Sequence, residues 1–330
     1  MNTNNSEVLY KNIAVNREIT TNFVVISSVK SPSVSLCIPT NGIIRWVFPV
    51  LDSIYDQNID ENSFEVVVMD NGSSNEFRLL MTDYAKKHHN LTYAKTSAYE
   101  FLSEIETYKA AKGDFIKFIN HRTKLLPGTL NEFIHFSMDH RDKKPTVYFS
   151  NGELKGNKDV TVLETFDQYV KKLSYFSSWS TGMGFWKSQF ETLDLSHPNY
   201  LFPHTDILFS DPSNRTYIVD NRVLLYEMPT GTVPKGTYNL FYAFTVEYLS
   251  IILNLCRNGY ISVDTFNTVK NDNLDFVAEL YLTYVVNKSE CSYDLSNYKK
   301  WVECYYSLGQ LKSRASKIKM QHILNRFKKK

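Results

Sequence analysis

Three short polar segments could do chemistry, and each follows directly after an apolar run. They are Pro39-Thr40-Asn41-Gly42, Asp70-Asn71-Gly72-Ser73 and Asn120-His121-Arg122-Thr123. A carboxylate such as Asp70 accepts hydrogen bonds from N–H donors, and a guanidinium such as Arg122 forms charge-assisted hydrogen bonds with phosphate. In an open parallel sheet, ligands bind outside the carboxyl ends of the strands. The three segments are therefore the first candidates for a ligand site.

The motifs of several other enzyme classes are missing from the sequence. It has no GxxxxGK[ST] loop, no GxGxxG opening a helix, no HExxH and no GxSxG. Its four cysteines lie far apart and form no CxxC pair. P-loop nucleotide hydrolysis, zinc proteolysis, serine hydrolysis, a cysteine zinc site and a disulfide framework are therefore not expected.

The elements that must position the three segments are alternating strands and helices. Apolar runs predict strands, and apolar residues at helical spacing predict helices between them. We expect strands at 34–38, 66–69, 91–94 and 115–119, shorter strands at 23–26, 146–149, 217–219 and 223–226, and helices at 46–54, 77–84 and 101–111. Pro39 should end the first strand because it has no N–H for a ladder, and Gly113 should cap the third helix. This order predicts a mainly parallel α/β sheet.

The same segments carry a resemblance to a known family. The sequence resembles the family-2 glycosyltransferases of the GT-A fold at Leu36–Asn41, Val67–Ser73 and Ala111–Arg122, the last followed by Leu126-Pro127-Gly128. The resemblance covers roughly residues 34 to 226. It implies an α/β fold of the GT-A type: a Rossmann-like, mixed, mainly parallel sheet with flanking helices, here followed by a helical C-terminal region. It also implies a nucleoside-diphosphate sugar as donor.

By this resemblance, the donor binds along the strand ends. The loop of Pro39, Thr40 and Asn41 would wrap the nucleoside, and Asp70, with Asn71 beside it, would accept hydrogen bonds from the base. Each assignment has a structural alternative. Asp70 could be a turn aspartate in an Asp-Asn-Gly bend, and Asn41 could cap the helix that follows.

The third segment departs from the family pattern. Family members usually carry Asp-x-Asp where this sequence has Asn120, His121 and Arg122, and a carboxylate there holds a divalent metal on the diphosphate. We expect Arg122, with His121, to stabilise the leaving diphosphate directly, and we expect no metal site or other cofactor. Two alternatives stay open: manganese or magnesium held through His121 and carboxylates elsewhere, or a plain exit from strand to loop.

The resemblance also indicates an acceptor side. The Ser-Thr-Gly-Met-Gly-Phe-Trp segment that holds Gly182 and Trp186 matches the acceptor segment of the family, so both are expected to contact the acceptor, and Trp179 or Trp186 could stack on a sugar. About twenty residues later, the segment that holds His204, Thr205 and Asp206 stands where the family has an acidic pair, with Thr205 in place of the first acid. His204 is expected to bind the acceptor and Asp206 to act as general base. The alternatives are core tryptophans and a carboxylate that starts a helix.

Proline and glycine residues, which interrupt helices and strands, divide the chain. Pro229, Gly231, Pro234 and Gly236 form its densest cluster of such residues, and helical patterns follow. The expected parts are a polar N-terminal extension at 1–33, a GT-A domain at 34–228 (a nucleotide-binding half at 34–125 and an acceptor half at 126–228), a helical region at 229–310 and a basic amphipathic tail at 311–330.

The charge of the 330-residue chain is concentrated at its C-terminus. The sequence has 37 basic and 35 acidic residues, but residues 311–330 hold eight basic residues and no acidic one. Met320, Ile323, Leu324 and Phe327 recur at helical spacing beside these basic residues. We expect the tail to lie on an anionic membrane surface, with a solvated tail as the alternative. No nucleic-acid partner is expected, because no aromatic residues alternate with the basic ones.

The sequence predicts no membrane-spanning segment and no signal peptide. It has no apolar run of about 18 residues, and Met1–Asn12 is polar. Together with the tail, this predicts a cytoplasmic enzyme that is peripheral on the inner face of the cytoplasmic membrane. It would transfer one sugar from a nucleoside-diphosphate sugar to a hydroxyl of a lipid-linked or polysaccharide acceptor of O-antigen or capsule type, inverting by direct displacement. A catalytically silent glycan- or nucleotide-binding scaffold is the alternative.

Overall fold

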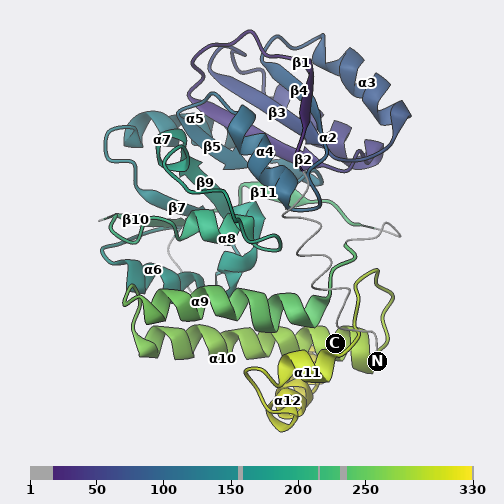
Figure 1. Ribbon diagram of the computed structural model, residues 1–330, viewed down its shortest axis with the longest axis vertical. Coiled ribbons are helices and arrows are strands. Elements are labelled where there is room, and N and C mark those ends of the chain that lie inside the picture. Colours follow the sequence, from purple (N-terminus) through teal and green to yellow (C-terminus); the bar gives the residue numbers. More distant parts are fainter. Residues whose placement is uncertain (1–17, 155–158, 215, 231–235, 329–330) are drawn as a thin grey trace. The chain divides into compact units, whose positions relative to one another are not determined.

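The computed structural model describes most of the chain and divides it into two compact units (Figure 1). One unit comprises Met1–Glu164 and Trp179–Pro229, and the other comprises Thr165–Ser178 and Thr230–Lys330. The described residues are 18–154, 159–214, 216–230 and 236–328. Residues 1–17 of the expected extension, Gly231 and Pro234 of the breaker cluster, and Lys329 and Lys330 of the tail lie outside them.

The first unit is built on a large β-sheet. Within the described residues, nine strands lie in the order β1-β4-β3-β2-β5-β9-β7-β10-β8, and β6 and β11 form a separate two-stranded sheet. The strands are β1 (Thr21–Val25), β2 (Val34–Thr40), β3 (Phe64–Asp70), β4 (Leu91–Thr96), β5 (Phe115–Phe118), β6 (Thr123–Leu125), β7 (Thr146–Phe149), β8 (Val160–Leu163), β9 (Met183–Trp186), β10 (Tyr217–Asp220) and β11 (Leu225–Glu227).

Most strands of the large sheet run in one direction. β4, β3, β2 and β5 are parallel neighbours, and β10 is parallel to β7. β9 is antiparallel to both β5 and β7, and the outer strands β1 and β8 are antiparallel to their neighbours. The sheet is therefore mixed and mainly parallel, which confirms the predicted fold class. Because parallel strands end at the same edge, the residues that follow β2, β3 and β5 lie along one edge of the sheet.

Helices cover both faces of this sheet. The helices of the first unit are α2 (Ile44–Tyr55), α3 (Asn75–Ala85), α4 (Leu102–Ala110), α5 (Thr129–His140), α7 (Lys187–Phe190) and α8 (Pro203–Leu208). Val34, Leu36 and Ile38 of β2 are fully buried in a core that also contains residues of α2, α3 and α5. Side chains alternate along a strand, so Cys37 faces the other side, where its thiol contacts the Thr107 carbonyl of α4. Because helices cover both faces of the sheet, a ligand can reach the sheet only at the ends of its strands.

The first strand does not end at Pro39, so that expectation is wrong: β2 continues to Thr40. The Cys37 carbonyl accepts a hydrogen bond from the Ile119 N–H of 2.8 Å, so the backbone nitrogen of Pro39 points to the same, β5 side. Pairing with β5 has ended at Cys37, and the missing N–H therefore costs no ladder bond.

Gly113 is not the expected helix cap. Helix α4 ends at Ala110, and the backbone of Ala111 is already extended. A Cβ atom on Gly113 would lie 2.7 Å from the Ser35 backbone nitrogen. Gly113 is therefore required for close approach of the chain to β2.

The second unit is helical. It contains α6 (Phe166–Leu173), η1 (Ser174–Ser178), η3 (Tyr242–Glu247), α9 (Tyr248–Arg257), α10 (Val263–Leu280), η4 (Tyr281–Val286), α11 (Tyr298–Val302) and α12 (Leu308–Lys328). Residues 165–178 belong here and not to the expected acceptor half, because they bond to α10 and its cap. Asp167 accepts hydrogen bonds from the Ser262 N–H at 2.6 Å and the Thr265 hydroxyl at 2.9 Å, and Ser174 donates to Asp272 at 2.7 Å.

Helix α12 carries the basic tail, and its first half packs on α10. Leu311 and Ala315 are buried, and Arg314 forms an ion pair of 3.1 Å with Asp275. No helix among the described residues combines the length and the apolar character needed to cross a membrane.

The second half of α12 exposes its apolar side chains. Met320, Ile323 and Leu324 are 60%, 46% and 54% exposed. The side chain of Phe327, the fourth member of the predicted stripe, lies outside what the structure describes. The three described members of the stripe thus form an exposed helical face within the second unit.

Candidate functional site

The structure brings the three predicted segments together at the carboxyl edge of the sheet. The Thr40 hydroxyl and His121 Nδ1 share a hydrogen bond of 2.9 Å, which joins the first segment to the third. The Asn71 N–H donates to the Thr40 carbonyl at 2.9 Å, which joins the first to the second. A Cβ atom on Gly72 would lie only 2.0 Å from the Asn41 carbonyl oxygen, so glycine is required for this contact. Segments as far as 81 residues apart in sequence therefore form one surface.

Asp70 is buried at this edge and is held by three donors of the protein. Its Oδ1 accepts from the Gly72 N–H at 2.7 Å, and its Oδ2 accepts from the Tyr93 hydroxyl at 3.0 Å and Lys95 Nζ at 2.8 Å. The Gly72 bond is the turn role given above as the alternative. Burial and the Asp70 carboxylate raise the pKa of Tyr93, so that phenol stays a donor. The surface next to Asp70 therefore includes Lys95, whose side chain is 26% exposed.

The third segment is a turn with a paired cation. Asn120 Oδ1 accepts from the Arg122 N–H at 3.1 Å, and Arg122 donates through Nη1 to the Met228 carbonyl at 3.2 Å. The Arg122 guanidinium also forms an ion pair with Glu227, which is 57% exposed. The pairing of β6 with β11 brings Glu227 opposite Thr123 and thus next to Arg122. The predicted phosphate ligand therefore has a carboxylate partner that no local sequence pattern indicates.

His121 is a neutral imidazole at ordinary pH. Burial and the neighbouring Arg122 cation lower its pKa to about 4. Its ring lies 5.2 Å from that of Trp46 in α2. The imidazole can therefore exchange a hydrogen bond with Thr40 or a ligand, but it brings no positive charge for a diphosphate.

The two predicted acceptor-side residues in α8 have different environments. Asp206 is exposed, and its Oδ2 accepts from the Asn199 N–H at 3.2 Å. His204 is buried, and its Nδ1 lies 3.2 Å from Oε2 of Glu104, which is buried in α4. Asp206 can therefore meet a solvent-borne hydroxyl, whereas His204 joins α8 to α4 and has little surface for an acceptor.

Trp186 and Gly182 also lie inside the unit. Trp186 is fully buried, its indole N–H donates to the Pro145 carbonyl at 3.0 Å, and its ring lies 5.1 Å from Phe115. A Cβ atom on Gly182 would lie 2.1 Å from the Tyr148 ring. The expectation that Trp186 stacks on a sugar is therefore wrong for this structure, because its ring has no accessible face. Gly182 is required by packing.

Comparisons with solved structures identify the architecture. No family model matches the sequence, and no curated protein matches it. Solved structures of S. aureus TarS do match in three dimensions: TarS residues 1–349 superpose with a TM-score of 0.54 at 15% identity, covering 86% of this chain and 81% of that one. The same fragment in complex with UDP gives a TM-score of 0.53 at 14% identity, covering 84% and 80%. The fold is of the GT-A type.

The match does not extend over the whole of TarS. Against the longer TarS chain the TM-score is 0.50 at 15% identity, and 76% of this chain covers 44% of that one. The chain thus spans less than half the length of that structure. At this level of identity, what the two proteins share is the fold.

Among the described residues, the three segments at the carboxyl edge of the sheet offer no carboxylate pair for a metal. At the position where the resemblance to family-2 glycosyltransferases implies Asp-x-Asp stand Asn120, whose oxygen is bonded to the Arg122 N–H, then His121 and the Arg122 guanidinium. Glu227 is nearby but is paired with Arg122. Across the part of the chain that the structure describes, no group of three or more His, Cys, Asp or Glu side chains is arranged to hold a metal ion. The residues at this position do not fit a carboxylate-held metal.

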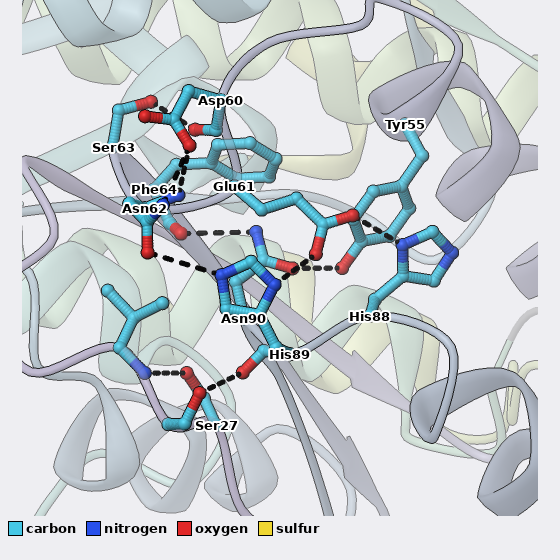
Figure 2. A network of polar contacts seen from close by, with 12 residues as sticks. Ser27, Tyr55, Asp60, Glu61, Asn62, Ser63, Phe64, His88, His89 and Asn90 are labelled. Atoms are coloured by element: carbon cyan, nitrogen blue, oxygen red, sulfur yellow. Dashed lines mark hydrogen bonds and ion pairs between the residues drawn. The ribbon is translucent and has the colours of Figure 1, made fainter.

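A second polar cluster lies at the opposite edge of the GT-A sheet (Figure 2). The Glu61 carboxylate contacts His88 Nδ1 at 2.7 Å and His89 Nδ1 at 3.0 Å, and the Tyr55 ring stacks on His88. Asn90 is buried and accepts from the Tyr55 hydroxyl at 3.0 Å. These residues come before the first residues of β3 and β4, so the cluster joins turns at the amino ends of the strands and is separate from the carboxyl edge.

Proposed function

We propose that this chain is a glycosyltransferase that moves one sugar from a nucleoside-diphosphate sugar to a hydroxyl of a lipid-linked O-antigen or capsule glycan. The observation that carries the proposal is the joining of the Thr40, Asn71 and His121 segments at one edge of a GT-A fold. Structures with this fold include TarS in complex with UDP and with UDP-GlcNAc. In open α/β sheets, this edge is where ligands bind.

The proposed donor site has a neutral base side and a cationic diphosphate side. On the base side, Pro39, Thr40, Asn41 and Asn71 offer backbone and amide groups to the nucleoside. Asp70 would act mainly by holding Gly72 and Lys95, since its own oxygens have protein donors. Three donors leave the carboxylate one further acceptor position, so direct hydrogen bonding of Asp70 to the base stays part of the proposal.

The proposed diphosphate side uses Arg122. Binding of the diphosphate would displace the exposed Glu227 carboxylate from the guanidinium, because a phosphate oxygen forms a stronger, more highly charged pair. The Met228 carbonyl would keep the guanidinium in place during this exchange. Asn120 would hold the turn, and His121 would donate or accept one hydrogen bond as a neutral ring.

The proposed reaction is a single displacement with inversion. Asp206 takes the proton of the acceptor hydroxyl, and the acceptor oxygen forms a bond to the anomeric carbon. The bond from that carbon to the diphosphate oxygen breaks at the same time, and the nucleoside diphosphate leaves with its electron pair. Arg122 stabilises the added negative charge on the leaving group. Exposure of Asp206 supports its assignment, since a general base must reach the acceptor.

A donor screen tests the function. Thermal-shift measurements with UDP-, GDP-, CDP- and dTDP-sugars should show stabilisation by one donor class, and the purified protein should release nucleoside diphosphate from that donor. Repeating the release assay in excess EDTA tests the metal-free assignment, with retained release expected. Binding without release would favour the silent scaffold, which the Arg122–Glu227 pair and the lack of Asp-x-Asp also support.

We also propose that α12 binds an anionic membrane surface on the cytoplasmic side, where a lipid-linked acceptor would be found. Met320, Ile323 and Leu324 are exposed, and eight basic residues with no acidic one occupy 311–330. Each cation near an anionic surface contributes about 1 kcal/mol. This complementarity of charge and apolar area describes an interfacial helix.

Vesicle flotation tests the membrane proposal. The full chain should float with vesicles that contain phosphatidylglycerol and not with pure phosphatidylcholine. Ile323→Asp with Leu324→Asp should abolish flotation. Leu79→Asp is the matched control, since Leu79 of α3 is a similarly exposed leucine (53%) outside the tail. Equal flotation by the tail and control variants would refute the proposal.

A further inference from the structure

The turn before β9 lies at the same sheet edge as the donor segments. β9 begins at Met183 and runs antiparallel between β5 and β7, with Met183 opposite Tyr148 and Gly184 opposite Lys117. Because β9 runs opposite to β5 and β7, the residues that precede β9 lie at the edge where β5 and β7 end. The η2 turn (Ser180–Gly182) and Trp179 before it are therefore placed beside the exit of β5, which continues into Asn120.

Lys117 of β5 ties this turn to the donor strand. Its Nζ donates to the Thr181 carbonyl at 2.8 Å and to the Phe118 carbonyl at 2.9 Å, and the side chain is fully buried. The ammonium also lies over the rings of Phe133 at 5.5 Å and Phe149 at 5.3 Å. Burying an amine is costly, and its two carbonyl partners are the groups that offset the cost. The position of Thr181 relative to the end of β5 is thus set by one side chain.

Tyr148 of β7 holds the same turn from the other face of the sheet. Phe149 faces Lys117, and side chains alternate along β7, so Tyr148 points to the opposite side. The Tyr148 hydroxyl donates to the Trp179 carbonyl at 3.0 Å. Its ring occupies the space next to Gly182, where a Cβ atom would lie 2.1 Å away. Two buried side chains from two strands therefore fix the turn at 179–182.

We propose that Lys117 and Tyr148 are positioning residues that hold the turn at 179–182 as the binding surface for the acceptor sugar. The inference rests on the proposed function and deepens it. Trp179 is partly exposed, unlike the buried Trp186, and an indole ring is suited to the apolar face of a pyranose. Because Lys117 also binds the Phe118 carbonyl, two residues before Asn120, it fixes the acceptor surface relative to the donor segment.

Kinetics with two substrates test the inference. The probes are the donor found by the thermal-shift screen and an alkyl pyranoside acceptor, chosen from octyl glucoside, octyl galactoside and octyl N-acetylglucosaminide. Tyr148→Phe removes only the hydroxyl and should raise the acceptor KM about tenfold, the scale of one lost hydrogen bond. Donor hydrolysis without acceptor should stay within about twofold of wild type. Trp179→Ala should raise the acceptor KM at least as much.

A matched control separates positioning from general loss of packing. Ser137→Ala removes a buried hydrogen bond of 2.7 Å to the Ser33 carbonyl at the opposite edge of the sheet and should leave both parameters unchanged. If Lys117→Met folds, it should raise the acceptor KM as Tyr148→Phe does. If Lys117→Met does not fold, Tyr148→Phe alone tests the inference. An unchanged acceptor KM in Tyr148→Phe, or an equal fall in donor hydrolysis, would overturn the inference.

Hydrogen exchange distinguishes failure of this inference from failure of the proposed function. In Tyr148→Phe, amides at 179–184 should lose protection while those at 120–123 keep theirs. Loss of protection without a change in the acceptor KM would refute the acceptor role alone. A wild-type protein that neither hydrolyses nor transfers any donor sugar would refute the proposed function, on which the inference depends.

Discussion

Replacing Lys117 by methionine should change how stability depends on pH. Lys117 is fully buried, and burial lowers the pKa of its ammonium to about 7, whereas an unfolded lysine has a pKa near 10.4. Between these values the unfolded chain binds one more proton than the folded chain. The free energy of unfolding of the wild type should therefore rise with pH across this window.

The magnitude follows from the size of the pKa shift. Lowering the pKa of Lys117 from near 10.4 to about 7 corresponds to a penalty of about 5 kcal/mol below pH 7, because a tenfold change in the proton equilibrium is worth about 1.4 kcal/mol. The penalty falls by about 1.4 kcal/mol for each pH unit above 7, so about 3 kcal/mol should be recovered between pH 7 and pH 9. The methionine side chain of the variant cannot titrate, and the difference between wild type and Lys117→Met cancels the contribution of all other groups.

Urea unfolding measures this difference. Trp46 and Trp186 are buried in the first unit, and a Trp301→Phe background removes the tryptophan of the second unit from the fluorescence signal. The buried Trp301 indole N–H has no hydrogen-bond partner among the described residues, so this change should be mild. A stability difference that is flat from pH 6 to pH 9 would show that Lys117 does not titrate in this range, and the argument for its costly burial would be refuted.

Four further perturbations test the site. Asp206→Asn should lower kcat about 10²- to 10⁴-fold with unchanged donor affinity, and near-wild-type turnover would remove Asp206 as base. Glu227→Gln should tighten nucleoside-diphosphate binding about two- to fivefold in calorimetry, because it removes an exposed competitor of Arg122. Arg122→Met should weaken nucleoside-diphosphate binding about tenfold or more. If Arg122→Met and Glu227→Gln bound the nucleoside diphosphate with equal affinity, Arg122 would not be a diphosphate ligand. The pKa of His121 is about 4 in the folded protein and about 6.5 in the unfolded chain, so the unfolded chain binds more protons between these values. In urea unfolding, wild type should therefore lose stability relative to His121→Asn as pH falls from 6.5 to 4. Parallel curves of unfolding free energy against pH for the two proteins would contradict this.

The strands that end at the proposed donor site could be predicted because their residues carry the signal locally. The run Val66–Met69 is apolar and β-branched, and β3 covers it and ends at Asp70 as expected. The meeting of Thr40 with His121 followed from the rule that parallel strands end together. Local pattern and sheet geometry were sufficient for these elements.

The partners of the site residues could not be predicted, because they come from distant parts of the chain. Arg122 meets Glu227 through a two-strand ladder that joins residues 123–125 to residues 225–227. Lys95 contacts Asp70 from the carboxyl end of β4, and it lies one residue beyond the apolar run that predicts that strand. Trp186 belongs to the core because Phe115 and Pro145 surround it, and neither is near it in sequence.

Release of nucleoside diphosphate from a sugar donor by the purified 330-residue chain is the decisive assay for the proposed glycosyltransferase activity. We expect one class of nucleotide sugar to be turned over and an alkyl pyranoside to accelerate the release. Asp206→Asn should bind the donor with wild-type affinity but release almost nothing. Failure of every nucleotide sugar to bind, or donor release that is unchanged in both Asp206→Asn and Arg122→Met, would contradict the proposed activity.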